Sequence, residues 1–255
     1  MKRVSTVVKL TSAAVVAAAL VGGATALGDQ GEPAGGHGGR EPANLGQVKL
    51  DVKEYYGDYK DADGNHQAAD DSTWAKQTAR EVRGAQRYLE LRLAQGVDNP
   101  AIVLDIDDTS ELTYGFNADH DFGYDPVKAE EAINNGEYPA IKPTLEFANW
   151  AAGEGVKVYF LTGRPEHQRP ATEKNLANEG YPAFAAAFLK PETEAPDWLP
   201  CGLKCTTTEY KTSARAYVES LGDTIVVNLG DQQSDLNGGH AERAVKLPNP
   251  MYYLP

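Results

Sequence analysis

The sequence predicts an α/β fold in which a central parallel sheet is flanked by helices. From residue 101 onward, short apolar runs alternate with segments of helical periodicity, as in a chain of strand–helix–strand units. The runs are almost continuously apolar, which is typical of strands buried on both faces. Prolines stand at the expected starts of the intervening helices and glycines at their ends, where each is favoured.

The first 26 residues have the pattern of a secretory signal peptide. A basic start is followed by an apolar run over residues 13–21 and by the small residues Ala24-Thr25-Ala26 at a cleavage site. The apolar run is short for a membrane span, although an uncleaved N-terminal anchor is the alternative. We therefore expect a secreted protein without stable membrane association. Residues 27–46, rich in Gly, Pro and Ala, are expected to form a flexible leader.

Composition fits one soluble domain, which we expect over residues 47–255. Of the 255 residues, 41% are apolar and 24% are charged, and the formal net charge is −13. Such an acidic chain lacks the basic face that a phosphate backbone requires, which argues against nucleic acid polymers as partners. A phosphorylated small molecule can still bind where a metal ion supplies local positive charge.

A helical extension is expected before the first strand. Asp70-Asp71-Ser72-Thr73 is a cluster of residues that cap helices, and a helical pattern follows to about Gln95, ended by Gly96. The positions expected to be buried along this helix are Trp74, Ala85, Tyr88, Leu89 and Leu93.

Apolar runs mark the strands, and the segments between them mark the helices. The expected strands are 101–104, 157–161, 185–189, 224–229 and, less regular, 244–247. The expected helices between them are 143–152, 165–179 and 208–221. In a parallel sheet of this kind, ligands bind at the carboxyl ends of the strands.

The stretch over residues 110–141 is long for a simple crossover and is expected to form a small helical cap after the first strand. Its aromatic residues include Tyr114, Phe116 and Tyr124, which either line an apolar entrance to the site or pack inside the insertion. His120 lies in the same stretch, where a surface loop is favoured over substrate contact.

The chain has two cysteines, Cys201 and Cys205. In an exported protein this C-x3-C pair is expected to form a local disulfide. Two thiolates without other ligands nearby make a poor zinc site.

Acidic residues cluster where the first and fourth strands end. Residues two apart in an extended segment point to the same side, so Asp105 and Asp107 can face one pocket. Two close carboxylates repel each other unless a cation lies between them, and Mg²⁺ is a divalent ion that prefers such oxygen ligands. Asp231 and Asp235 can reach the same ion. The four aspartates therefore predict a metal site at this edge of the sheet.

A phosphate group in that pocket would also need hydroxyl and cationic groups. Thr162 directly follows the second strand, so its hydroxyl and the following amides can hold phosphate oxygens at a helix N-terminus. Lys211, in the first turn of the helix over 208–221, can neutralise both a nucleophile and a phosphate oxygen. Lys190 is the alternative lysine, although its place favours a strand end at the surface.

Arg164 leaves two interpretations open. Its guanidinium either contacts phosphate or substrate, or it pairs with Glu166 or a neighbouring acid at the start of the helix.

These motifs, taken together, resemble the haloacid dehalogenase (HAD) superfamily of phosphohydrolases. The sequence is most similar to its secreted acid phosphatases, which include bacterial class B-type enzymes and plant vegetative storage proteins. Asp105-Ile106-Asp107-Asp108-Thr109 matches the D-x-D-x-T signature. The other matching segments are 161–166 with Arg169, Thr172, Asn175 and Leu176, then 210–215 around Lys211, and the acidic segment 230–235. Four motifs in order at strand ends are a specific signal.

The resemblance implies a Rossmann-like core and a Mg²⁺-dependent reaction on small phosphomonoesters. Asp105 would be the nucleophile that forms an aspartyl-phosphate, and Asp107 would be the general acid and base. The Asp105 carboxylate, the Asp107 carbonyl and Asp231 would hold the ion, with Asp235 a ligand through water or a support.

The resemblance also implies that Thr162, Gly163 and Lys211 position the phosphoryl oxygens. Homo-oligomers occur among related enzymes. The alternative functions are a non-enzymatic storage or binding protein on the same fold, a phosphotransferase, and a receiver-type phospho-acceptor domain. The export signal and the acid two residues after the nucleophile argue against the receiver.

Overall fold

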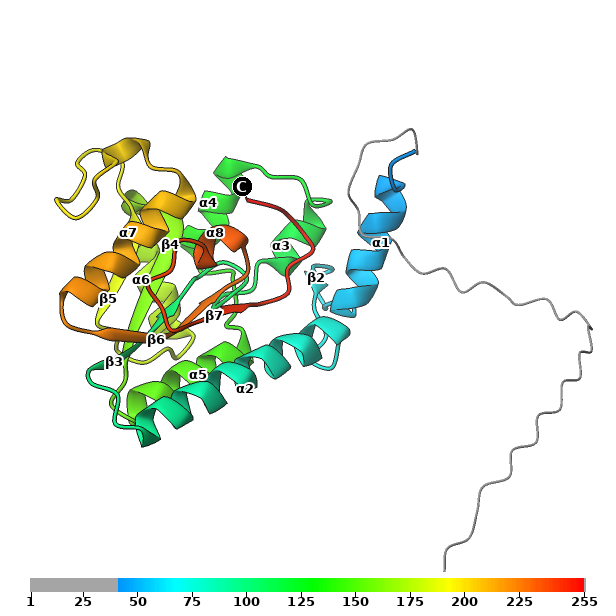
Figure 1. Cartoon of the computed structure of the whole chain (residues 1–255). Helices are drawn as coiled ribbons and strands as arrows, with labels where there is room; N and C mark the ends of the chain where they lie inside the picture. The colour runs from blue at the N-terminus through cyan, green and yellow to red at the C-terminus, as the bar shows by residue number, and fades with distance from the viewer. Residues whose placement is uncertain (1–40, 255) are drawn as a thin grey trace, which may run out of the picture. The chain divides into compact units, whose positions relative to one another are not determined.

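Five parallel strands form the central sheet of the computed structural model, which describes residues 41–254 (Figure 1). Their order is β5-β4-β3-β6-β7, and each neighbouring pair is parallel. The strands are β3 (Pro100–Leu104), β4 (Lys157–Pro165), β5 (Ala186–Lys190), β6 (Thr224–Gly230) and β7 (Arg243–Lys246). The predicted α/β fold with its parallel sheet is confirmed, including the less regular fifth strand.

Helices cover both faces of the sheet. The helices are α2 (Thr73–Ala94), α5 (Lys142–Gly153), α6 (Arg169–Asn178) and α7 (Thr207–Ser220). Alternate residues of a strand point to opposite faces. Ile102 and Leu104 accordingly lie in the apolar cluster with α2, α5 and α6, whereas Val103 lies in the cluster with α7. Figure 1 shows α2 and α5 side by side along the sheet. Packing on both faces therefore holds in place the strands β3 and β6, which the acidic motifs follow.

Helix α2 begins where the capping residues predicted. The Ser72 hydroxyl accepts a hydrogen bond from the backbone N–H of Ala75 at 3.1 Å. Trp74, Ala85 and Leu89 are buried, as expected. Tyr88 and Leu93 are half-buried at the edge of the same core.

The helix predicted over residues 165–179 begins later than expected. Strand β4 continues to Pro165, whose backbone is extended (φ −68°, ψ 154°), and pairs there with Lys190 of β5. A short 3₁₀ turn, η1 (Glu166–Gln168), precedes α6, and Pro170 takes the first-turn position that proline favours. Thr162 therefore lies within the end of a strand and not at a helix N-terminus.

The insertion after β3 is helical, as predicted. It contains α3 (Tyr114–Asp119) and α4 (Pro126–Asn135), and α4 is capped by the Asp125 carboxylate, which accepts from the N–H of Val127 at 3.0 Å. Backbone bridges from Glu111 to Asp107 and to Ala140 join both ends of the insertion to the first motif. The cap is thus attached directly beside the predicted catalytic acids.

A helix, α1 (Leu45–Tyr56), and a two-stranded hairpin precede α2. The hairpin strands are β1 (Tyr59–Lys60) and β2 (His66–Gln67). Asn44 caps α1 by accepting from the N–H of Gln47 at 3.1 Å. The helix therefore begins inside the segment 27–46 that was predicted to be a flexible leader, so its last residues are ordered. The predicted signal peptide and residues 27–40 lie outside the described residues.

The remaining elements are a disulfide-linked turn and a short helix. Cys201 and Cys205 form the predicted disulfide, with their Cα atoms 5.1 Å apart, next to the 3₁₀ turn η2 (Gly202–Lys204). A short helix, α8 (Gln233–Leu236), follows β6. Among residues 41–254, no helix combines the length and apolarity needed to cross a membrane.

Candidate active site

The carboxyl ends of β3 and β6 bring two acidic segments together. The N–H of Asp105, directly after β3, donates to the carbonyl of Leu229 in β6 at 3.0 Å. Asp231 follows β6 by one residue, and α8 places Asp235 one turn further on. All three aspartates are buried. One carboxylate oxygen from each lies within 4.8 Å of one from each of the others.

Lys211 contacts two of the three clustered aspartates. Its Nζ donates to Oδ1 of Asp105 at 2.5 Å and to Oδ1 of Asp235 at 2.6 Å. The lysine is on α7, whose first turn is fixed by a capping box between Thr206 and Glu209. Helix α7, which begins close to the predicted position, therefore places Lys211 in contact with the acids.

Asp235 supports the site in two ways. Besides contacting Lys211, its Oδ2 accepts from the N–H of Gln232 at 2.8 Å and caps α8. Gly230 makes this close approach possible. A Cβ atom at residue 230 would lie 2.3 Å from the Cβ of Asp235.

The carboxylate of Asp231 is held by two amides. Nε2 of Gln232 and Nδ2 of Asn249 both donate to its Oδ2, at 2.6 and 2.7 Å. Its Oδ1 has one hydroxyl contact, from Thr109 at 3.4 Å. Asn249 was not predicted as a site residue, because it lies in a segment without periodicity, between two prolines.

The electrostatics of the cluster fit a hard divalent cation. Burial, followed by the charges of Asp235 and other neighbours, raises the pKa of Asp105 well above its usual range, although Lys211 acts in the opposite direction. Burial and Asp235 raise the pKa of Asp231 to about 7. Burial alone would lower the pKa of Lys211, but Asp105 and Asp235 outweigh it and raise it. Three buried carboxylates face a single ammonium, so negative charge is in excess, and their oxygen donors suit a hard divalent cation.

Asp107 is not among the three clustered carboxylates and is paired with Arg164 instead. Nη2 of Arg164 donates to Oδ1 of Asp107 at 2.7 Å, and Nε contacts both carboxylate oxygens at 3.1 and 3.2 Å. The Asp107 side chain keeps 31% exposure, whereas Arg164 keeps 3%. The Asp107 carboxylate is therefore held by a buried arginine and remains partly exposed to solvent.

A buried glutamate anchors Arg164 in turn. Oε2 of Glu111 accepts from Nη2 of Arg164 at 2.7 Å, and its Oε1 accepts from Nδ2 of Asn175 at 2.8 Å. Asp107 and Glu111 raise the pKa of Arg164 against the effect of burial. The pairing of Arg164 with acids is thus present, but its partners are Asp107 and Glu111. Glu166 instead pairs with Arg169.

Thr162 and Gly163 lie at the end of β4. The Thr162 side chain is fully buried, and its hydroxyl oxygen accepts from the N–H of Arg164 at 3.1 Å. Within residues 41–254 this hydroxyl donates to no side chain. Gly163 is exposed and leaves open space where a side chain would be. The Thr162 hydroxyl therefore accepts one hydrogen bond at the end of β4, and Gly163 places no side chain there.

Asp108 is a further buried acid, to which no role was assigned from the sequence. Its backbone is left-handed (φ 55°), a conformation that aspartate tolerates better than most residues. Its carboxylate accepts from Thr113 Oγ1 at 2.6 Å and from the Tyr252 hydroxyl at 2.7 Å. Burial raises its pKa to about 7. Its position next to Asp107 in the first motif was the sequence feature that could have indicated a role at the site.

Other candidates lie away from the cluster. Lys190 ends the edge strand β5. Tyr114 is fully buried and stacks on Tyr56 with ring centroids 4.3 Å apart, so it packs in the core and does not line an entrance. Tyr124 is 81% exposed. His120 bonds through Nδ1 to the carbonyl of Phe116 at 2.8 Å.

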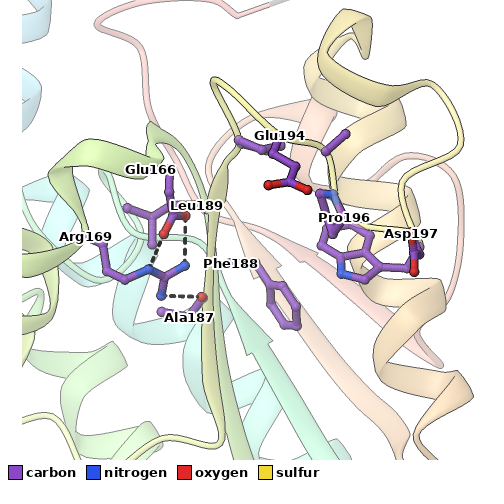
Figure 2. Close-up of a pocket in the computed structure, with 11 residues that line it drawn as sticks. Glu166, Arg169, Ala187, Phe188, Leu189, Glu194, Pro196 and Asp197 are labelled. Carbon is purple, nitrogen blue, oxygen red and sulfur yellow. Dashed lines mark hydrogen bonds and ion pairs between the residues drawn. The ribbon is translucent and has the colours of Figure 1, made fainter.

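A pocket of about 590 Å³ lies beside β5 (Figure 2). Its lining includes Arg169, Phe188 and Trp198, together with the carboxylates of Glu166, Glu194 and Asp197. Figure 2 shows Arg169 already engaged by Glu166 and by the carbonyl of Ala187. None of the residues in the aspartate cluster lines it. An acidic pocket with an occupied arginine suits a phosphate anion poorly.

The chain is similar to plant acid phosphatases and storage glycoproteins. It is 34% identical over 156 residues to "Acid phosphatase 1" of Solanum lycopersicum, covering 60% of this chain and 58% of that protein. It is 32% identical over 176 residues to "Stem 28 kDa glycoprotein" of Glycine max, covering 66% of each. With "Vegetative storage protein 1" of Arabidopsis thaliana it shares 29% over 157 residues, covering 60% of this chain and 55% of that protein. The chain thus spans less than two thirds of these relatives' own length.

The fold is also similar to a solved structure. The class C acid phosphatase from Bacillus anthracis matches with a TM-score of 0.60 and 23% identity, over 82% of this chain and 86% of that chain. At this identity the likeness shows the fold. A family model described as HAD superfamily, subfamily IIIB (acid phosphatase), matches residues 42–255. With nearly all of the described chain inside that match, the protein belongs to HAD subfamily IIIB, the acid phosphatases.

Proposed function

We propose that the chain is a secreted, Mg²⁺-dependent acid phosphatase that hydrolyses small phosphomonoesters through an aspartyl-phosphate on Asp105. The observation that carries the proposal is the position of Lys211, whose ammonium contacts Asp105 and Asp235 inside a buried aspartate cluster. Such a cluster is costly to bury in a purely structural role, because its like charges repel. A bound cation would offset this repulsion, and the lysine could then contact a phosphoryl group.

The metal-binding residues in this proposal are Asp105 and Asp231 through their carboxylates and Asp107 through its backbone carbonyl. Asp235, which already contacts Lys211 and caps α8, supports them. When bound, Mg²⁺ would neutralise the carboxylates and the phosphoryl oxygens.

In the first half-reaction, the carboxylate of Asp105 attacks phosphorus. The new bond between Asp105 and phosphorus forms as the bond from phosphorus to the leaving oxygen breaks. Asp107 donates its proton to that oxygen, so the alcohol leaves neutral. Arg164 keeps the Asp107 carboxyl aimed while leaving one side open.

In the second half-reaction, water hydrolyses the aspartyl-phosphate. Asp107, now a carboxylate, accepts a proton from the attacking water, and the bond between phosphorus and Asp105 breaks to release inorganic phosphate. The Thr162 hydroxyl, the Gly163 amide and the Lys211 ammonium hold the phosphoryl oxygens in line during both steps.

A storage or binding protein on the same fold is the second candidate, because the relatives include stem glycoproteins and a vegetative storage protein. The presence of Asp105 and Asp107 together favours the enzyme. A phosphotransferase would form the same aspartyl-phosphate but pass the group to an acceptor other than water.

The test is a phosphomonoesterase assay on the secreted protein with Mg²⁺ and with EDTA. We expect turnover that EDTA abolishes and Mg²⁺ restores. Asp105→Asn should remove activity without unfolding the protein, because the change is nearly isosteric. Asp63→Asn, an exposed change outside the site, is the control. Activity without metal, or wild-type rates in Asp105→Asn, would overturn the proposal.

Secretion is tested separately by mass spectrometry of protein recovered from the culture medium. Cleavage after Ala26 predicts an N-terminus at Leu27. Retention of the intact N-terminus in the membrane fraction would favour the uncleaved anchor.

A further inference from the structure

The last described residues, 248–254, run along the candidate active site and are here called the C-terminal strap. In Figure 1 the chain leaves β7 and passes α8 and α3. The strap is fixed at both ends. Nε1 of Trp74 donates to the carbonyl of Pro248 at 3.1 Å, and the N–H of Leu254 donates to Oε1 of Gln232 at 3.2 Å.

Asn249 links the strap to a predicted metal ligand. Its Nδ2 donates to Oδ2 of Asp231 at 2.7 Å. Its Oδ1 accepts from the N–H of Met251 at 2.9 Å, which fixes the direction of the amide. Met251 in turn packs against the apolar cluster that contains Tyr56 and Trp74. The amide is therefore oriented by the folded body of the protein and points its donor at Asp231.

Tyr252 links the strap to the first motif. Its hydroxyl donates to Oδ2 of Asp108 at 2.7 Å, and Asp108 also accepts from the N–H and hydroxyl of Thr113. Asp108 follows Asp107 directly and has a left-handed backbone. The strap therefore contacts both acidic segments, one after β3 and one after β6.

The contacts on Asp231 favour one orientation of its carboxylate. Both amide donors, from Gln232 and Asn249, meet at Oδ2, which leaves Oδ1 with a single hydroxyl contact. Hydrogen bonds of this kind orient a ligating carboxylate and hold it in place before the ion arrives. Gln232 is a neighbour of Asp231 in the chain, whereas Asn249 comes from a distant segment.

We propose that the C-terminal strap is a positioning element of the metal site, in which Asn249 orients Asp231 for Mg²⁺ binding. The proposal rests on the proposed function above, because it assigns Asp231 to the metal. In this role Asn249 acts through its contact with Asp231 and is not itself a ligand of the ion. A strap with a structural role alone would stabilise the fold equally with and without Mg²⁺.

The experiment compares wild-type protein, Asn249→Ala and Tyr253→Ala by two Mg²⁺ titrations of the whole secreted chain. One follows the unfolding temperature without substrate, and the other follows phosphatase rate. Loss of an outer contact to a ligand typically weakens metal affinity about 10- to 100-fold. We expect the Mg²⁺ concentration for half effect to rise by about tenfold or more in Asn249→Ala in both titrations. The rate at saturating Mg²⁺ should approach that of wild type.

Tyr253 is the matched control, since it lies in the same strap and is 76% exposed. Its substitution should leave both titrations unchanged. If Asn249→Ala does not fold, Asn249→Ser keeps a polar side chain too short to reach Asp231 and is measured instead.

Two results would count against the inference in different ways. An unchanged half-effect concentration in Asn249→Ala, while wild type responds to Mg²⁺, overturns the positioning role and leaves the proposed function intact. No Mg²⁺ response in wild-type protein overturns the proposed function, and the positioning role with it.

Discussion

Lys211 lies between Asp105 and Asp235, with its ammonium 2.5 Å from one carboxylate and 2.6 Å from the other. The lysine and both acids are buried. Removing one partner from a buried ion cluster leaves uncompensated charge, which destabilises a protein more than the net contribution of the pair itself. The same residue is therefore expected to affect both folding and reaction.

Replacing Lys211 by Met should lower the free energy of unfolding by about 3–5 kcal/mol and phosphatase kcat by at least about a hundredfold. Urea unfolding and steady-state kinetics measure the two effects. Lys190→Met is the matched control, because Lys190 ends β5 and was the alternative lysine. If Lys190→Met lost activity and Lys211→Met kept it, the assignment of the motif lysine would be reversed.

The main elements of the fold were predictable because their signals are local. Capping at Ser72, apolar strands and glycine-ended helices depend on neighbouring residues, and the structure places them within a few residues of the expected bounds. The predicted start of α6 was wrong because proline at residue 165 is compatible with extended backbone as well as with the first turn of a helix. There the pairing of β4 with β5, a tertiary contact, decided the conformation.

The candidate site was predictable where its residues follow strands and not where they approach from elsewhere. Asp105 and Asp231 directly follow strands that a parallel sheet brings together, and Lys211 lies near the predicted start of α7. Asn249 and Tyr252 reach the site from a segment with no strand or helix pattern, so no local signal marks their contacts. The role of Glu111 could not be predicted from the sequence either, because it depends on a tertiary contact with the buried Arg164.

Arg164 is expected to be a positioning residue for Asp107. Arg164→Met should lower kcat about 10- to 100-fold while leaving the Mg²⁺ half-effect concentration near the wild-type value, because the arginine contacts Asp107 and not the metal cluster. It should also destabilise the protein, since Glu111 would lose its charged partner. Arg169→Met, which removes contacts to Glu166 and Glu173, is the control. A weakened Mg²⁺ response with normal kcat would contradict this role.

The contribution of Asp231 to the stability of the metal-free protein should fall as pH rises from about 4 to about 7. The folded state holds the pKa of Asp231 near 7, above its ordinary value of 3.8, so across this window the folded state binds protons that the unfolded state has released. The stabilisation from the protonated Asp231 carboxyl is therefore complete below its ordinary pKa of 3.8. It is lost as pH rises through the folded-state pKa of about 7. Mg²⁺ binds the deprotonated carboxylates, so the stabilisation by Mg²⁺ should be larger at pH 7.5 than at pH 5.

Asp231→Asn isolates this contribution from other titrating groups. Without metal, the variant should unfold at a higher temperature than wild type at pH 7 and at a similar temperature at pH 4, and it should respond weakly to Mg²⁺. Thermal unfolding at both pH values, with Mg²⁺ and with EDTA, provides the measurement. A metal-free wild type that gains stability over this window relative to Asp231→Asn would show that Asp231 is ionised without cost.

Gly230→Ala should damage the site without replacing any acidic side chain. The added Cβ would lie 2.3 Å from the Cβ of Asp235, closer than the two atoms can approach, so α8 or the end of β6 must shift. Overpacking of this kind costs about 1–3 kcal/mol, and the displacement should move Asp235 away from Lys211 and raise the Mg²⁺ half-effect concentration. Gly153→Ala is the matched control, because a Cβ there meets nothing within 4 Å and alanine favours the helix in which it lies. Equal effects of the two substitutions on Mg²⁺ binding would mean that the close packing of residues 230 and 235 does not set the geometry of the acids.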